Sequence, residues 1–300
     1  MIGRLLSRLA STVPHKPKVE CIFDEITNTC TYLVSCPQTG ASCVIDPVLD
    51  YDPVNHRTST LHTDKVIQRI QSENLKLTHI IETHIHADHL TGAQVLKKAY
   101  PHAKTMIGSH VVTVQKTFAK LLNLPEISLT GSEFDVLVNH NDEFHIGGLH
   151  MRAIHSPGHT PACTVYVIGD AVFTGDTIFM PDFGTARCDF PGGSAELLFE
   201  SIQKIFELPD SHRVFVGHDY GTSERKFAWE STIHAEKFHN KQANHRVAKE
   251  EFVAWRKGRD SKLPMPKLIM QSLQVNLRNG LFPSPESNGQ VYFKLPINLI

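Results

Sequence analysis

The sequence lacks any apolar run near the roughly 20 residues that span a lipid bilayer, and it has no long block of lysine or arginine. Lysine and arginine (30 together) nearly balance aspartate and glutamate (31), so the formal net charge is −1. These absences argue against a membrane-embedded protein and against binding to nucleic acid or an anionic membrane surface.

The six cysteines form no C-x-x-C pair. A chain of 300 residues with 41% hydrophobic positions can bury a sizeable core without disulfides. We therefore expect reduced thiols and an intracellular compartment.

The N-terminal segment has a composition of its own. Arg4 and Arg8 lie one helical turn apart among leucines and serines, and no acid precedes Glu20. This pattern is typical of a mitochondrial transit peptide, although a disordered N-terminus would also account for residues 1–18. The expected location is the mitochondrial matrix, with the cytoplasm as the alternative.

Strand and helix patterns alternate along most of the chain, which predicts an α/β fold. Two halves, each a sheet with helices outside, would give an αββα sandwich over residues 19–221. Residues 222–300 are expected to form a mostly helical C-terminal extension packed on this domain. Helices are predicted at 63–73, from about 89 to 99, at 194–206, 229–247 and 250–259, and a proline-broken stretch at 263–266 precedes a further run at 271–278.

The strongest motif is H-x-H-x-D-H, which follows the predicted strand 77–83 and contains His84, His86, Asp88 and His89. Imidazole nitrogens and carboxylate oxygens suit zinc or ferrous iron, whereas calcium and magnesium prefer oxygen ligands. The motif therefore predicts a transition-metal site.

Further ligand types follow later strands. His159 lies in S-P-G-H-T, Asp176 in T-G-D and His218 in G-H-D-Y. Each alone would be an ordinary loop residue, but the ordered set indicates a common sheet edge. We expect His84, His159 and Asp176 to share one metal ion.

This series of motifs resembles the metallo-β-lactamase superfamily over about residues 21–220, and the resemblance implies the αββα sandwich. The segment 183–193, with R-x-D-F at Arg187 to Phe190, is similar to the persulfide dioxygenases, the group related to the ethylmalonic encephalopathy protein. The tail segments 263–266 and 272–276 resemble the bacterial branch of that group.

The resemblance implies an oxidoreductase of sulfide and persulfide metabolism that converts glutathione persulfide, dioxygen and water to glutathione and sulfite. His84, His159 and Asp176 would bind one Fe(II) per chain and leave coordination positions open, as in non-haem iron oxygenases. The remaining motif residues would orient ligands and water or form a vacant second metal site. They are His86, Asp88, His89 and His218.

Substrate contacts are expected near the R-x-D-F segment. Arg187 would anchor a glutathione carboxylate or hold its loop through Asp189, since a planar guanidinium suits either role. Tyr220 would donate a hydrogen bond to substrate or serve as a packed aromatic. Cys188 is a further candidate as a sulfur relay, which depends on the pKa and exposure of its thiol. A homodimer is compatible with the sequence.

The alternative is a binuclear zinc hydrolase of glutathione thioesters, of the glyoxalase II type, because seven candidate ligands could hold two zinc ions. Such hydrolases usually carry G-C-G-R after the metal-binding aspartate, whereas this chain has Gly184-Thr185-Ala186-Arg187. A third class, a metal-dependent binding protein without turnover, would leave the open coordination positions without a purpose.

Overall fold

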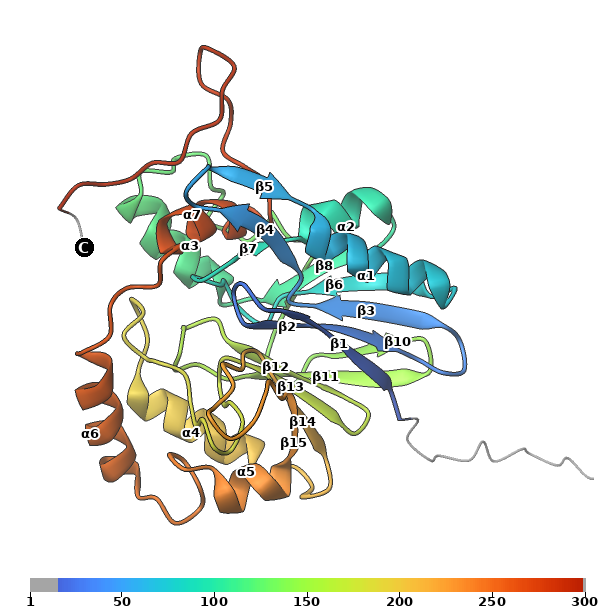
Figure 1. The fold of residues 1–300 in the computed structure, drawn as a ribbon, viewed down its shortest axis with the longest axis vertical. Coiled ribbons are helices and arrows are strands. Elements are labelled where there is room, and N and C mark those ends of the chain that lie inside the picture. Colours follow the sequence, from blue (N-terminus) through green and yellow to red (C-terminus); the bar gives the residue numbers. More distant parts are fainter. Residues whose placement is uncertain (1–15, 299–300) are drawn as a thin grey trace, which may run out of the picture.

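A computed structural model describes residues 16–298, and residues 1–15, which hold most of the predicted transit segment, lie outside this range. Two six-stranded sheets face each other, with helices on the outer face of each (Figure 1). The predicted αββα sandwich is therefore confirmed.

The first sheet has the strand order β1-β2-β3-β6-β8-β9. Helices α1 and α2 pack on its outer face, and a small sheet β5-β4-β7 lies beside it. The elements of this half are β1 (Lys18–Asp24), β2 (Thr29–Ser35), β3 (Ala41–Ile45), β4 (Val48–Asp52), β5 (Arg57–Ser59), α1 (Leu61–Ser72), β6 (Lys76–Ile81), β7 (Leu90–Thr91), α2 (Ala93–Ala99), β8 (Lys104–Gly108), α3 (Val111–Leu121) and β9 (Val136–Val138).

The second sheet has the order β10-β11-β12-β13-β14-β15. Helix α4 covers its outer face and α6 packs on α4, whereas α7 returns to the first half and packs with α3. The elements are β10 (Glu143–Ile146), β11 (Leu149–His155), β12 (Thr164–Ile168), β13 (Ala171–Gly175), α4 (Ala195–Ile205), β14 (Arg213–Val216), β15 (Glu230–Thr232), α5 (Ile233–His239), α6 (Lys249–Asp260) and α7 (Ile269–Asn276).

The main core lies between the two sheets. Strands β2, β3, β12 and β13 are buried along their whole length, and most of their residues are apolar. Tyr32 of the first sheet meets Phe173 and Phe215 of the second edge to face, with ring centroids 5.2 and 5.5 Å apart. The Tyr32 hydroxyl also donates to the Val216 carbonyl at 2.6 Å, so one side chain joins the sheets.

Two predicted helices differ from the structure. The helix expected from about residue 89 begins only at Ala93, because residues 90–91 pair with β4 as strand β7. The helix expected over 229–247 is confined to α5 (Ile233–His239), since Glu230–Thr232 pairs with β14 as strand β15. In both places strand pairing with a distant segment overrides the local helical pattern. The prediction of free cysteines is confirmed, as all six thiols are unpaired.

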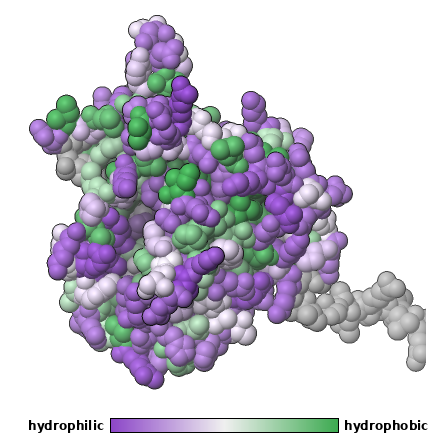
Figure 2. Space-filling model, in the orientation of Figure 1, coloured by the Kyte–Doolittle hydropathy of each residue, from purple (hydrophilic) through white to green (hydrophobic). Residues whose placement is uncertain are grey.

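The visible surface is mostly hydrophilic (Figure 2). Among residues 16–298, no helix is long and apolar enough to cross a membrane. After α7 the chain projects from the body as a loop that is predominantly hydrophilic (Figures 1 and 2).

Tyr32→Phe should lower the free energy of unfolding by about 1–3 kcal/mol, because the buried Val216 carbonyl loses its short hydroxyl donor while the aromatic packing remains. Urea unfolding followed by circular dichroism measures this change. Tyr292→Phe is the control, since Tyr292 is exposed and should change stability by less than about 0.5 kcal/mol. Equal effects of the two variants would contradict the bridging role of Tyr32.

Candidate metal centre

The predicted site residues come together at one edge of the sandwich, where strands of both sheets end. The H-x-H-x-D-H motif follows β6, His159 lies between β11 and β12, and Asp176 follows β13. His218 follows β14, which runs parallel to β13. A backbone hydrogen bond from Thr164 N–H to the Thr83 carbonyl, 2.9 Å long, connects the two sheets at this edge.

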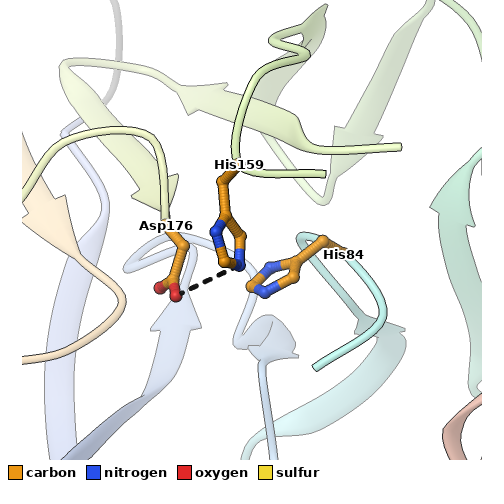
Figure 3. Close-up of side chains that lie close together, drawn as sticks. All are labelled: His84, His159 and Asp176. Atoms are coloured by element: carbon orange, nitrogen blue, oxygen red, sulfur yellow. Dashed lines mark ion pairs between the residues drawn. The ribbon is translucent and has the colours of Figure 1, made fainter. Parts of the chain in front are cut away.

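His84, His159 and Asp176 form a compact group with their side chains turned toward one another (Figure 3). One ligand atom from each lies within 4.8 Å of the other two, and all three residues are at most 8% exposed. The His159 Nε2 atom is 3.6 Å from Asp176 Oδ2, and the two imidazole rings are perpendicular with centroids 5.0 Å apart. This is a two-histidine, one-carboxylate set.

Hydrogen bonds fix the ring tautomers. Thr83 Oγ1 donates its proton to Asp46 Oδ2, so it accepts from His84 Nδ1–H at 3.0 Å. His159 Nδ1–H donates to the Arg187 carbonyl at 2.7 Å. In the neutral form of each ring, the Nε2 lone pair therefore points into the group, which is the arrangement of a metal-binding imidazole.

Several buried side-chain atoms of the predicted site residues have no hydrogen-bond partner within the described chain. They are His84 Nε2, His86 Nδ1, His89 Nε2, Asp176 Oδ1 and His218 Nε2. Buried polar atoms without partners are costly, and a bound cation would compensate those that face it. The donor set therefore fits a transition-metal ion.

A second group adjoins the first. His86, Asp88 and His218 also place ligand atoms within 4.8 Å of one another. His218 Nδ1–H donates to the Asn28 carbonyl at 3.1 Å, and its Nε2 lies 3.3 Å from Asp176 Oδ1. Asp176 thus lies between the two groups. The His89 ring is next to that of His86, with 4.2 Å between the centroids.

The sequence analysis did not identify Asp46 and Glu82, whose carboxylates contact His86 of the motif. Asp46 accepts hydrogen bonds from Thr83 N–H at 2.7 Å and from the hydroxyl of the same residue at 2.8 Å. His86 Nε2 lies 3.0 Å from Asp46 and 3.3 Å from Glu82. Asp46 comes directly after the buried strand β3, which pairs with β6, the strand before the motif. This position is the sequence signal that could have identified it.

Burial and charge act in opposite directions on the histidines. Burial, reinforced by neighbouring imidazoles, holds the pKa of His84 well below its usual value and lowers that of His89 to about 4. Burial also opposes protonation of His86, but the Asp46 and Glu82 carboxylates outweigh it and raise the pKa of His86 well above normal. The ring of His84 is therefore neutral and can donate its Nε2 lone pair.

The close approach of the strands at the site requires glycine. Gly175, directly before Asp176, has a φ of +48°, and a Cβ there would lie 2.5 Å from Thr83 Oγ1. A Cβ on Gly217 would lie 2.7 Å from Asp176 Oδ1. The glycine of T-G-D thus allows the two sheets to approach each other at the site, and the glycine of G-H-D-Y leaves room for the Asp176 carboxylate.

The group opens into a cavity of about 600 Å³. His159, Asp176 and Asp88 lie at its base, and its walls come from the segment 179–187, from Tyr220 and from the C-terminal extension, including Lys241, Gln242 and residues 255–266. The extension therefore encloses the space next to the candidate metal ligands.

Arg187 and Tyr220 both line this cavity. The Arg187 guanidinium forms a bidentate pair with Asp189, at 2.6 and 2.5 Å, and donates to the Pro264 carbonyl at 2.7 Å. These contacts correspond to the loop-holding role that the sequence suggested. Tyr220 stacks on Phe183 with centroids 5.0 Å apart.

Cys188 is buried among apolar side chains of the second half. Burial, followed by the nearby Asp260 charge, raises the pKa of its thiol far above the usual value. The thiolate that a sulfur relay needs is therefore disfavoured.

Comparisons with known proteins agree with this geometry. Residues 28–218 match the family model of the metallo-beta-lactamase superfamily. The chain is 47% identical to "Glyoxylase B2" of Dictyostelium discoideum, covering 95% of this chain and 99% of that protein. It is 44% identical to the "Beta-lactamase hydrolase-like protein" of Xylella fastidiosa (strain Temecula1), covering all of this chain and 69% of that protein.

More distant relatives carry another name. The mouse protein "Persulfide dioxygenase ETHE1, mitochondrial" is 30% identical, with 88% of this chain and 89% of the mouse protein covered. The crystal structure of ETHE1 from Myxococcus xanthus superposes with a TM-score of 0.70 at 30% identity, covering 88% of this chain and all of that one.

A metal-binding αββα sandwich with these motifs defines a class of enzymes. The chain belongs to the metallo-beta-lactamase superfamily. Within it, the chain is similar both to proteins named as hydrolases and to persulfide dioxygenases.

Asp46→Asn should raise the dissociation constant for zinc by about 10–100-fold, because the hydrogen bonds that fix Thr83 and, through it, His84 depend on this carboxylate. Chelator competition with the metal-free protein measures the constant. Asp170→Asn, which removes a carboxylate from an ion pair with Arg213 away from the site, is the control and should leave zinc affinity unchanged. Unchanged affinity in Asp46→Asn would contradict the orienting role.

Proposed function

We propose that the protein is a glutathione persulfide dioxygenase that converts glutathione persulfide, dioxygen and water to glutathione and sulfite. The observation that carries the proposal is the group of His84, His159 and Asp176, two of which, His159 and Asp176, line a cavity with unpaired cations in its wall. The similarity to persulfide dioxygenases over nearly nine-tenths of both chains supports it.

His84, His159 and Asp176 would hold one Fe(II). A two-histidine, one-carboxylate face leaves positions open for dioxygen and for a sulfur ligand, and iron held there would supply the oxygen chemistry. The carboxylate of Asp176 also faces His218 Nε2 at 3.3 Å. His218 would thus restrain the orientation of Asp176 without itself binding this ion.

The cavity wall offers charge for an anionic substrate. Four cationic side chains line it, and two of them, Arg187 and Arg256, already pair with Asp189 and Asp260. Lys241 and Arg259 form no ion pair with any residue in the described range 16–298. Glutathione carries two carboxylates, so these two cations would hold its ends while the persulfide extends toward the metal ligands.

Aromatic side chains shape the same cavity. Phe183 stacks on Tyr220, and the Lys241 ammonium lies 5.5 Å from the Phe183 ring centroid. With Phe179 and Trp255 these rings would exclude water around the reacting sulfur, and the Tyr220 hydroxyl would donate a hydrogen bond to it.

Protein purified without oxygen should contain about one iron per chain and should consume oxygen when glutathione persulfide is added, with sulfite as product. Elemental analysis, an oxygen electrode and sulfite determination measure these quantities. His159→Ala should lose the iron and the oxygen uptake, because only two of the three candidate ligands, His84 and Asp176, remain. Two zinc ions, no oxygen uptake and hydrolysis of S-lactoylglutathione would reject the proposal.

Arg259→Gln and Lys241→Gln should each raise KM for glutathione persulfide about 5–20-fold and change kcat by less than about twofold, because each removes one charged contact to a part of the substrate that does not react. Steady-state oxygen uptake measures both constants. Lys257→Gln, on the same helix as Arg259 but paired with Glu196 outside the cavity, is the control. A fall in kcat alone would contradict this placement of the substrate.

The second candidate function is hydrolysis of a glutathione thioester by two metal ions. It is favoured by the adjoining group of His86, Asp88 and His218 and by the names of the relatives at 44% and 47% identity. Both candidates would use the same cavity and the same cations. The metal content and the oxygen uptake distinguish them.

We also propose that the protein is located in the mitochondrial matrix. Its basis is the composition of residues 1–18, and the name of the mouse relative describes that protein as mitochondrial.

A further inference from the structure

A single peptide group connects His159 to a buried carboxylate of the C-terminal extension. The carbonyl of the Arg187–Cys188 peptide accepts from His159 Nδ1–H at 2.7 Å. The N–H of this same peptide, on Cys188, donates to Asp260 Oδ2 at 2.8 Å. His159, the peptide and the carboxylate therefore form one continuous chain of hydrogen bonds.

The carboxylate at the end of this chain is held firmly. Asp260, in the last turn of α6, is 5% exposed, and its other oxygen pairs with Arg256, which is 4% exposed. The Arg256 guanidinium also donates to the Thr185 carbonyl at 3.2 Å. Helix α6 thus contacts both ends of the short segment 185–188 that carries the acceptor for His159.

We propose that Asp260 is a positioning residue for His159 and acts through the Arg187–Cys188 peptide. Metal-binding histidines commonly donate their second ring N–H to a carboxylate or to a backbone carbonyl. Here a carbonyl takes that place, and a carboxylate one peptide further polarises it. The inference rests on the proposed role of His159 as a metal ligand.

The physical effect follows from the polarity of the peptide. A negative charge next to the N–H increases the electron density on the carbonyl oxygen, which then accepts more strongly from His159 Nδ1–H. A stronger hydrogen bond at Nδ1 makes Nε2 a better donor to a metal and fixes the plane of the ring. Because Asp260, Cys188 and His159 are buried and Arg187 is half-buried, water screens this effect little.

The sequence offers no local sign of this connection. Asp260 lies 101 positions after His159 and 72 after Cys188, on a helix that the motifs do not include. Its role gives the C-terminal extension a function beyond enclosing the cavity, since the extension also determines how one of the three candidate ligands is held.

The test compares Asp260→Asn with Lys257→Gln in the full-length protein. Lys257 lies on the same helix and pairs with Glu196 of α4 at the surface, so its loss removes a contact between α6 and α4 without touching the peptide. The dissociation constant for Fe(II) is measured without oxygen by chelator competition. We expect the dissociation constant to rise about 3–10-fold in Asp260→Asn, which is less than when a residue that hydrogen-bonds a metal ligand directly is lost. In Lys257→Gln it should rise less than about twofold.

A second readout is the His159 Nδ1–H proton resonance in the ¹⁵N-histidine-labelled, zinc-loaded protein, assigned by its loss in His159→Ala. The resonance should move upfield in Asp260→Asn and stay in place in Lys257→Gln. Asp260→Glu, which keeps the charge, should restore most of both properties. Should Asp260→Asn fail to fold, Asp260→Ser provides the same comparison.

The outcomes separate this inference from the proposed function. If the wild-type protein binds Fe(II) through His159 but Asp260→Asn leaves the affinity and the resonance unchanged, the inference is wrong and the ligand assignment stands. Equal losses in Asp260→Asn and Lys257→Gln would show a general effect of α6 packing and would also overturn it. If His159→Ala binds Fe(II) as the wild type does, the ligand assignment itself fails.

Discussion

Burial of many ionisable groups at one edge of the sandwich is the constraint on which the rest of the structure depends. Five histidines and several carboxylates lie there almost without solvent contact. Unpaired charges in such a place would cost several kcal/mol each. The fold therefore has to supply partners, through hydrogen bonds to backbone and side chains and through an ion for the atoms that stay unpaired.

The partners come from parts of the chain far from the motifs. Asp46 at the end of β3 fixes Thr83, the Arg187 carbonyl fixes His159, and the Asn28 carbonyl fixes His218. Each partner sets which ring nitrogen is protonated and so directs the other nitrogen into the site. The metal centre is consequently a property of both sheets and of the loops between them.

The C-terminal extension completes the site in two ways. It encloses the cavity with Lys241, Trp255 and Arg259, and it holds the segment 185–188 through Arg256 and Asp260. Relatives that share the sandwich but differ in this extension could keep the same metal ligands and accept other substrates, because the extension contributes much of the cavity wall.

The sequence by itself determined the αββα sandwich and the main candidate ligands, because strand periodicity and the short motifs after strands are local patterns. It also predicted that His84, His159 and Asp176 lie near one another. Only the tertiary structure decided the extent of β7 and β15, the tautomers of the histidines and the partners Asp46 and Asp260. These depend on contacts between residues far apart in the chain, which no local pattern contains.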